Sequence, residues 1–307
     1  MLQTIYQQTP LLQSYYHHQL GREVFYKMDC YQPSGSFKIR GMEHLCKRLI
    51  ANGHRRFIAS SGGNAGYSLA YVGQKLGVEI QVVVPETTPQ MMVNRIRMLG
   101  AKVKVFGADW NAAHQYASEQ SASEQIPYVP PFDHELLWEG HASVIAECAE
   151  DMDAPDTIVV SVGGGGLLNG VLLGMRQCGW NSKVIAAETT GAASFAAAFD
   201  AGHLVTLDEI STIATSLGAR QVSAKSLELS KDFDLATHVV SDALALQACE
   251  RLMAEANVLV EPACGAALSY AYNLPDSDKD EKILVIVCGG VCMDIELFEK
   301  YQSIVSG

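Results

Sequence analysis

Short apolar runs rich in β-branched residues alternate along this chain with segments of helical periodicity. The runs are RFIAS (56–60), EIQVVVP (79–85), KVKVFG (102–107), TIVVSVG (157–163), KVIAAE (183–188) and KILVIVCGG (282–290). Continuous apolar runs of this length are typical of strands buried on both faces of a parallel sheet. The helical segments are GMEHLCKRLIANG (41–53), PQMMVNRIRMLGA (89–101), SDALALQACERLMAEAN (241–257) and MDIELFEKYQS (293–303). This alternation predicts an α/β fold with open, twisted parallel sheets wrapped by helices.

Two proline-containing breaks, PSGSFK (33–38) and PYVPPFD (127–133), interrupt the alternation. They predict a small α/β domain of residues 41–134 and a discontinuous large domain of residues 1–40 and 135–307. A cleft between two such domains is a common place for an active site.

Charge and cysteine usage exclude several classes of protein. The formal net charge is -12, which disfavours nucleic-acid binding because phosphates would be repelled. No apolar run reaches the length of a membrane span, and the first residues do not resemble a secretory signal. The eight cysteines are scattered, without a C-x-x-C pair, which favours reduced thiols in a cytoplasmic protein.

The glycine-rich segment SVGGGGLLNG (161–170) lies between a predicted strand and a predicted helix. It fits neither the G-x-G-x-x-G dinucleotide fingerprint nor the G-x-x-x-x-G-K-[ST] phosphate loop. Two interpretations remain: a tight turn that needs small residues, or a phosphate site made of backbone N–H groups at a helix N-terminus. Four successive glycines favour the phosphate site.

Two other small-residue loops also follow predicted strands. In SSGGNAG (60–66), Asn64 is either a helix cap or part of a cradle for a carboxylate. In CGG (288–290), Cys288 is either a buried small side chain or a ligand contact at the carboxyl end of a strand. Glu261, in VEPACGA, has the plain interpretation of a cap for the following helix.

Lys38, in PSGSFKIRG (33–41), has three possible roles: a surface charge, a phosphate ligand or a nucleophile. A lysine in water is mostly protonated and therefore a poor nucleophile, whereas burial beside Phe37 would release the amine. Because the glycine-rich loop fills the phosphate role better, the nucleophile is favoured. Arg40 would hold this bend through a carboxylate that the sequence does not identify.

Six motifs in this order resemble the L-serine/L-threonine dehydratase family of liver type, which belongs to the fold type II pyridoxal-phosphate enzymes. They are PSGSFKIRG, SSGGNAG, PPFDHELLWEGHAS (130–143), SVGGGGLLNG, VEPACGAAL (260–268) and VIVCGG (285–290). The resemblance runs from about residue 20 to the C-terminus. It implies two parallel-sheet domains of the tryptophan synthase β-like architecture, pyridoxal 5'-phosphate as cofactor and a homodimer.

The resemblance also implies residue roles. Lys38 would hold the cofactor as a Schiff base and act as catalytic base, Phe37 would pack on the cofactor ring, Asn64 would bind its 3'-oxygen and Cys288 its ring nitrogen. The phosphate would lie on Gly163, Gly164, Gly165, Gly166 and Leu167, and the substrate carboxylate on Ser61, Gly62, Gly63, Asn64 and Ala65. A potassium site would use Glu188, Gly163, Ala192, Ser194, Leu217 and Ala219.

The implied reaction is β-elimination, which converts L-serine to pyruvate and ammonia and L-threonine to 2-oxobutanoate. An amino-acid racemase, a β-replacing synthase and a non-catalytic cofactor-binding protein remain as alternatives. Two positions depart from the family pattern: Gly62 stands where some members have alanine, and Ser216 where alanine commonly packs on the ring. Gly62 is expected to loosen the substrate loop.

Overall fold

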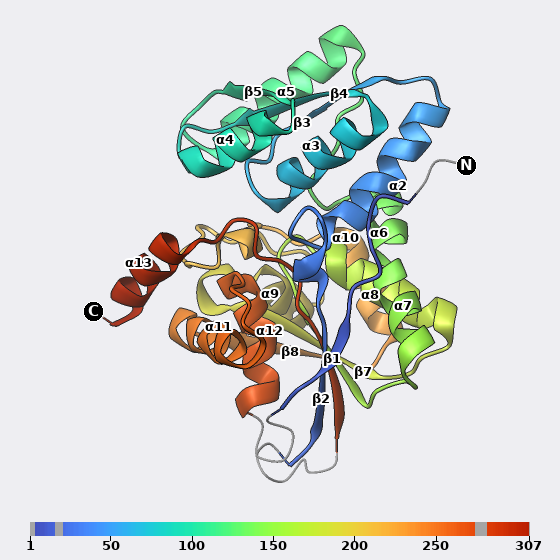
Figure 1. Ribbon diagram of the computed structural model, residues 1–307, viewed down its shortest axis with the longest axis vertical. Helices are drawn as coiled ribbons and strands as arrows, with labels where there is room; N and C mark the ends of the chain where they lie inside the picture. The colour runs from blue at the N-terminus through green and yellow to red at the C-terminus, as the bar shows by residue number, and fades with distance from the viewer. Residues whose placement is uncertain (1–3, 16–20, 274–280, 307) are drawn as a thin grey trace.

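The computed structural model describes residues 4–15, 21–273 and 281–306, which form two lobes, each built on its own sheet (Figure 1). The larger sheet has six strands in the order β1-β2-β9-β6-β7-β8. All neighbours pair in parallel except β1 and β2, which are antiparallel. Its strands are β1 (Leu11–Gln13), β2 (Glu23–Lys27), β6 (Thr157–Ser161), β7 (Lys183–Thr189), β8 (Leu235–Val240) and β9 (Lys282–Ile286).

The smaller sheet contains the parallel strands β3 (Arg56–Ala59), β4 (Glu79–Val84) and β5 (Lys102–Val105). Tyr128 forms an isolated parallel bridge with Ile58, so the chain passes beside β3 before it returns to the larger lobe. All six predicted strands are therefore confirmed, and so is the α/β class. Three strands were not predicted (β1, β2 and β8), because they are short or contain polar residues that break the apolar runs.

Helices cover both sheets, and four of them were predicted from periodicity. These are α2 (Lys38–Ala51), α4 (Gln90–Met98), α11 (Asp242–Ala256) and α13 (Ile295–Ser306). Helix α2 begins three residues before the predicted Gly41, so Lys38 lies in its first turn. The other helices are α3 (Asn64–Leu76), α5 (Trp110–Glu124), α6 (Glu135–His141), α7 (Ser143–Asp151), α8 (Gly166–Cys178), α9 (Ser194–Ala201), α10 (Ala224–Leu229) and α12 (Pro262–Asn273), with 3-10 turns at Asp29–Tyr31, Thr190–Ala192, Thr215–Leu217 and Ser230–Asp232.

Each lobe has its own hydrophobic core. The core of the larger lobe includes Phe37, and that of the smaller lobe includes Ile39 and Leu137. Side chains just outside residues 41–134 thus contribute to the smaller core, while the division of the chain at these residues stays a prediction. Within the described residues, no helix combines the length and apolar character that a membrane crossing needs.

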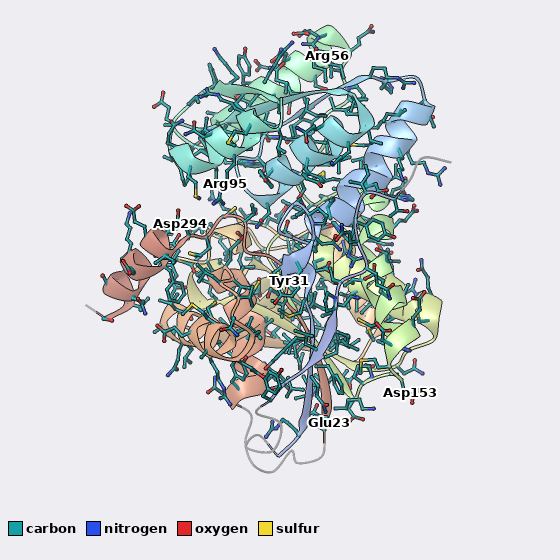
Figure 2. The ribbon with its side chains drawn as sticks, viewed as in Figure 1. Glu23, Tyr31, Arg56, Arg95, Asp153 and Asp294 are labelled. Atoms are coloured by element: carbon teal, nitrogen blue, oxygen red, sulfur yellow. The ribbon has the colours of Figure 1, made fainter. Side chains whose placement is uncertain are left out.

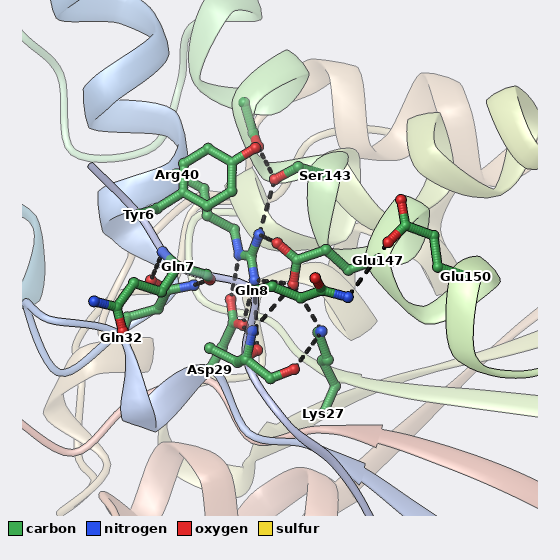
Figure 3. Close-up of polar contacts among 12 residues, drawn as sticks. Tyr6, Gln7, Gln8, Lys27, Asp29, Gln32, Arg40, Ser143, Glu147 and Glu150 are labelled. Carbon is green, nitrogen blue, oxygen red and sulfur yellow. Dashed lines mark hydrogen bonds and ion pairs between the residues drawn. The ribbon is translucent and has the colours of Figure 1, made fainter. Parts of the chain in front are cut away.

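Arg40 is the centre of a buried ion cluster that joins four segments of the chain (Figure 3). Its guanidinium donates to both carboxylate oxygens of Asp29, at 2.7 and 2.8 Å, and to both of Glu147, at 2.6 and 2.8 Å. Lys27 Nζ lies 2.7 Å from Glu147 Oε2 and donates to the carbonyl oxygen of Thr9. The carboxylate partner that the sequence did not identify is therefore a pair, Asp29 and Glu147.

Burial works against the charge of Arg40, but the two carboxylates outweigh it and raise the pKa of the guanidinium above its usual range. The cluster contains two positive and two negative groups, so its formal charge balances. Buried pairs of this kind are costly to break because the remaining charge is left without a partner.

We predict that Arg40→Met destabilises the protein by about 3–5 kcal/mol, because Asp29 would remain buried without a positive partner and Glu147 would keep only Lys27. The free energy of unfolding from chemical denaturation measures this loss. The control is Arg176→Met, which removes an exposed ion pair with Asp232 and is expected to cost roughly 0–1 kcal/mol. Equal losses in the two variants would contradict the role of the cluster.

Candidate active site

The PSGSFK bend is held against the carboxyl end of β9 by backbone hydrogen bonds. Ser36 forms an isolated antiparallel β-bridge with Gly289. The Phe37 N–H donates to the Cys288 carbonyl at 2.9 Å, and the Gly290 N–H donates to the Gly35 carbonyl at 3.0 Å. Two motifs that are about 250 residues apart in the sequence thus form one backbone unit. This unit fixes the position from which the Lys38 side chain starts.

The Lys38 side chain is partly buried between the two lobes. Its Nζ donates to the Pro131 carbonyl at 2.7 Å and lies 4.9 Å from the centre of the Phe37 ring. Burial lowers the pKa of Lys38 to about 8, although the carboxylate of Glu261 acts in the opposite direction. A neutral amine is therefore accessible near neutral pH, which favours a nucleophile and base over a surface charge.

The segment 131–133 crosses from Lys38 to the glycine-rich loop. A side chain on Gly164 would collide with the Phe132 ring, and one on Gly166 would meet the Phe132 backbone. Asp133 accepts a hydrogen bond from Ser223 at 2.6 Å, while the Ser223 N–H donates to the Gly164 carbonyl. The sequence motifs that contain Lys38 and the four glycines are thus connected through this segment.

The four glycines lead into the N-terminus of α8. Gly165, the residue before the helix, has φ +90°, and a Cβ there would lie 2.0 Å from Ser226 Oγ. Close packing alone therefore accounts for much of the glycine run. The first turn of α8 also has no side-chain cap, so its N–H groups can bind an anion.

The loop Ser61–Ala65 leads from β3 into α3 in the same way. Gly63 is the N-cap, without a side-chain hydrogen bond, and Asn64 is the first helical residue. The interpretation of Asn64 as a helix cap is therefore wrong. Thr88 packs against Gly62, and a Cβ on Gly62 would lie 2.5 Å from its methyl carbon. Thr88 thus occupies the space that an alanine side chain would need.

Asn64 instead contacts a buried carboxylate from the larger lobe. Its Nδ2 lies 2.9 and 3.0 Å from the two carboxylate oxygens of Glu261, and Ser216 Oγ donates to the same carboxylate. The side chain of Glu261 is thus engaged by the site, and its interpretation as a mere helix cap is wrong. The available signal was an ionisable residue inside the apolar stretch VLVEPACGAAL.

Cys288 and Cys264 have adjacent thiols, 3.2 Å apart, at the carboxyl end of β9. The hydrogen bond with Cys264 and then burial raise the pKa of the Cys288 thiol well above its usual range. Cys288 is therefore an uncharged thiol, which can exchange a hydrogen bond but does not act as a negative counter-charge.

Glu188 forms a second buried carboxylate, at the N-terminus of α9. Its two oxygens accept hydrogen bonds from the N–H groups of Phe195 and Ala196, and burial raises its pKa to about 7. Ser194 Oγ is buried without a partner among the described residues. A Cβ on Gly163 would lie 3.0 Å from Leu217 Cα, so these two predicted cation ligands are neighbours.

Comparison with known proteins agrees with this arrangement. Residues 2–289 match the family model described as pyridoxal-phosphate dependent enzyme. The chain is 45% identical over 282 residues to "L-serine dehydratase/L-threonine deaminase" of Mus musculus, covering 88% of this chain and 86% of that protein. It is 43% identical over 294 residues to "Serine dehydratase-like" of Rattus norvegicus, covering 92% and 89%.

A solved structure extends the likeness to the whole fold. The crystal structure of a fungal L-serine ammonia-lyase from Rhizomucor miehei superposes with a TM-score of 0.93 at 36% identity. It covers 98% of this chain and 99% of the other. The resemblance inferred from the six motifs is confirmed.

We predict that alanine is tolerated at Gly62 and not at Gly66. The methyl group at Gly62 meets the end of the Thr88 side chain, which can rotate, whereas the methyl group at Gly66 would lie 1.7 Å from the Ser61 carbonyl oxygen. Gly66→Ala should therefore lower the free energy of unfolding by about 1–3 kcal/mol, and Gly62→Ala by less. Chemical denaturation of both variants checks this order, and the reverse order would show that Thr88 cannot move.

Proposed function

We propose that this chain, which belongs to the pyridoxal-phosphate dependent enzyme family, is an L-serine ammonia-lyase that also accepts L-threonine. It converts L-serine to pyruvate and ammonia, and L-threonine to 2-oxobutanoate and ammonia. The observation that carries the proposal is the Lys38 amine, with its lowered pKa, bonded to Pro131 beside the glycine-rich loop, together with two uncapped helix N-termini that suit a phosphate and a carboxylate. The names of the relatives support the same reaction.

The residues present fit pyridoxal phosphate. Asn64 Oδ1 is buried without a hydrogen-bond partner among the described residues, as expected for a polar group beside a ligand. Lys38 would hold the aldehyde carbon of the cofactor, Phe37 would pack on its ring, Asn64 would bind its 3'-oxygen and Cys288 its ring nitrogen. Gly163–Gly166 and Leu167 would bind its phosphate. When bound, the cofactor supplies an electron sink for the negative charge that develops on the substrate α-carbon.

The chain's own groups carry out binding and proton transfer. The N–H groups and hydroxyl of Ser61–Ala65, at the N-terminus of α3, bind the substrate carboxylate and orient the amino acid. The neutral Lys38 amine removes the proton from the α-carbon, and its pKa of about 8 keeps a useful share of the amine unprotonated near neutral pH. Loss of the β-hydroxyl as water, followed by hydrolysis, completes the reaction.

The uncharged thiol at Cys288 favours elimination over the alternatives. A neutral partner does not keep the ring nitrogen protonated as a carboxylate would, so the electron sink is modest. A modest sink suffices for β-elimination and disfavours transamination. Racemisation and β-replacement are distinguished by their products: D-serine for a racemase, and a substituted alanine for a synthase.

Glu188 and its neighbours support a monovalent-cation site. The buried carboxylate and the Ser194 hydroxyl, which has no partner within the described part of the chain, are hard oxygen ligands, and oxygen ligands suit alkali cations. We include Ala192, Leu217, Ala219 and Gly163 as carbonyl ligands and potassium as the cation.

The enzyme is located in the cytoplasm and assembles as a homodimer. All eight cysteines are free, which supports a reducing compartment. Exposed apolar side chains on α11 and α13 support association with a second copy; they are Leu244, Met253, Ile295 and Ile304.

We predict that Lys38→Ala lowers the rate of keto-acid formation by about 10²-fold or more, because the base is lost. The assay uses L-serine, L-threonine and D-serine with added pyridoxal phosphate. The control, Lys102→Ala, removes an exposed lysine and should keep its activity. Wild-type protein that binds the cofactor but forms no keto acid would instead support the non-catalytic alternative, and D-serine formation a racemase.

We further predict that potassium raises both activity and thermal stability, and that Ser194→Ala or Glu188→Gln weakens this response. Melting temperature and turnover are compared in potassium, sodium and tetramethylammonium chloride at equal ionic strength. Equal responses to the three salts in the wild type would contradict the cation site.

A further inference from the structure

Glu261 is held rigidly before its side chain makes any contact. Its side chain is buried, its N–H donates to the Gly289 carbonyl at 3.2 Å, and its own carbonyl starts α12 by accepting from the Cys264 N–H at 2.8 Å. The Cys249 thiol donates to the same carbonyl at 3.3 Å. The carboxylate therefore projects toward the smaller lobe from a fixed backbone.

The described donors to this carboxylate are uncharged. They are the Asn64 amide, the Ser216 hydroxyl and the Cys292 N–H, the last at 3.4 Å. The negative charge is near enough to Lys38 to raise the pKa of its amine against the effect of burial. A buried carboxylate is costly without good hydrogen bonds, so its contact with Asn64 has a strong energetic basis.

A carboxylate fixes which end of an asparagine side chain it contacts. It can only accept hydrogen bonds, so Asn64 must turn Nδ2 toward Glu261 and Oδ1 away from it. Both carboxylate oxygens lie about equally far from Nδ2, at 2.9 and 3.0 Å. The angle between the two oxygens, measured at Nδ2, is much smaller than the angle between the two N–H bonds of the amide. One N–H group therefore points at both oxygens, and the other points elsewhere. Beyond Glu261, Nδ2 makes only a long contact, with Ser216 Oγ at 3.5 Å, so its second N–H can serve a closer acceptor.

We propose that Glu261 is a positioning residue that keeps an N–H of Asn64 directed at the 3'-oxygen of the bound cofactor, and that Ser216 holds Glu261 in place. The inference rests on the proposed function, in which Asn64 binds that oxygen. It also assigns a role to the serine at 216, where the family commonly has alanine. The Ser216 hydroxyl donates to Glu261 and so restricts the carboxylate to one orientation.

A double-mutant cycle of Glu261→Gln and Asn64→Ala tests this role, with the absorption spectrum and the dissociation constant of the cofactor as the measured quantities. A hydrogen bond donated to the 3'-oxygen favours its anionic form, so its loss should shift absorbance of the holoenzyme from the visible to the near ultraviolet. We expect Glu261→Gln to cause this shift and to raise the dissociation constant of pyridoxal phosphate about tenfold, the effect of losing a hydrogen bond to a charged acceptor. In the Asn64→Ala background, Glu261→Gln should cause no further change in either quantity.

The control is Glu255→Gln, which replaces another buried glutamate, bonded to Tyr26 and to the Tyr15 N–H and outside the site. It should leave the absorption spectrum and the cofactor affinity unchanged. If Glu261→Gln folds poorly, Ser216→Ala provides the second variant, with a smaller shift in the same direction.

Two results would overturn the inference. In the first, Glu261→Gln changes the spectrum and the cofactor affinity equally whether residue 64 is asparagine or alanine. In the second, neither Glu261→Gln nor Ser216→Ala changes the spectrum or the affinity. Either result would leave the proposed ammonia-lyase activity intact. Wild-type protein that binds no pyridoxal phosphate would contradict the proposed function itself, and with it this inference.

Discussion

The guanidinium of Arg40 connects the parts of the chain on which the site depends. It ties the first turn of α2 to Asp29 after β2 and to Glu147 in α7, and Lys27 joins the N-terminal segment to the same cluster. Lys38 lies two residues before Arg40 in that turn. Any shift of the cluster would therefore move the Lys38 amine relative to both lobes. Figure 1 shows α2 running from this junction into the smaller lobe.

The site combines two helix N-termini with the buried carboxylate of Glu261. Helices α3 and α8 begin at the loops proposed for the substrate carboxylate and the cofactor phosphate, so their positive ends would face negative groups. Glu261 has the opposite sign and faces Asn64, Ser216 and Lys38. The lobes also meet where Arg95 of α4 donates to the Val291 carbonyl; Figure 2 shows Arg95 beside the edge of the larger lobe that carries Asp294.

Much of the fold could be predicted because local patterns matched the tertiary arrangement. The six buried strands were visible as apolar runs, and α4 began after Pro89 as its sequence indicated. The start of α2 could not be located, because Ser36 and Phe37 are held by pairing with Cys288–Gly290, far along the chain. The cap interpretations of Asn64 and Glu261 failed for a related reason. Each resembles a helix cap in its own sequence, and only the tertiary structure shows that their side chains contact each other.

The sequence by itself determined the α/β class, the family and the residue types available for chemistry, because these depend on periodicity and on ordered motifs. Only the tertiary structure decided the environment of those residues. It brought Pro131 to Lys38, Cys264 to Cys288 and Glu261 to Asn64. The physical reason is that burial and hydrogen bonding set the pKa of an amine and the orientation of an amide, and both depend on neighbours that are distant in sequence.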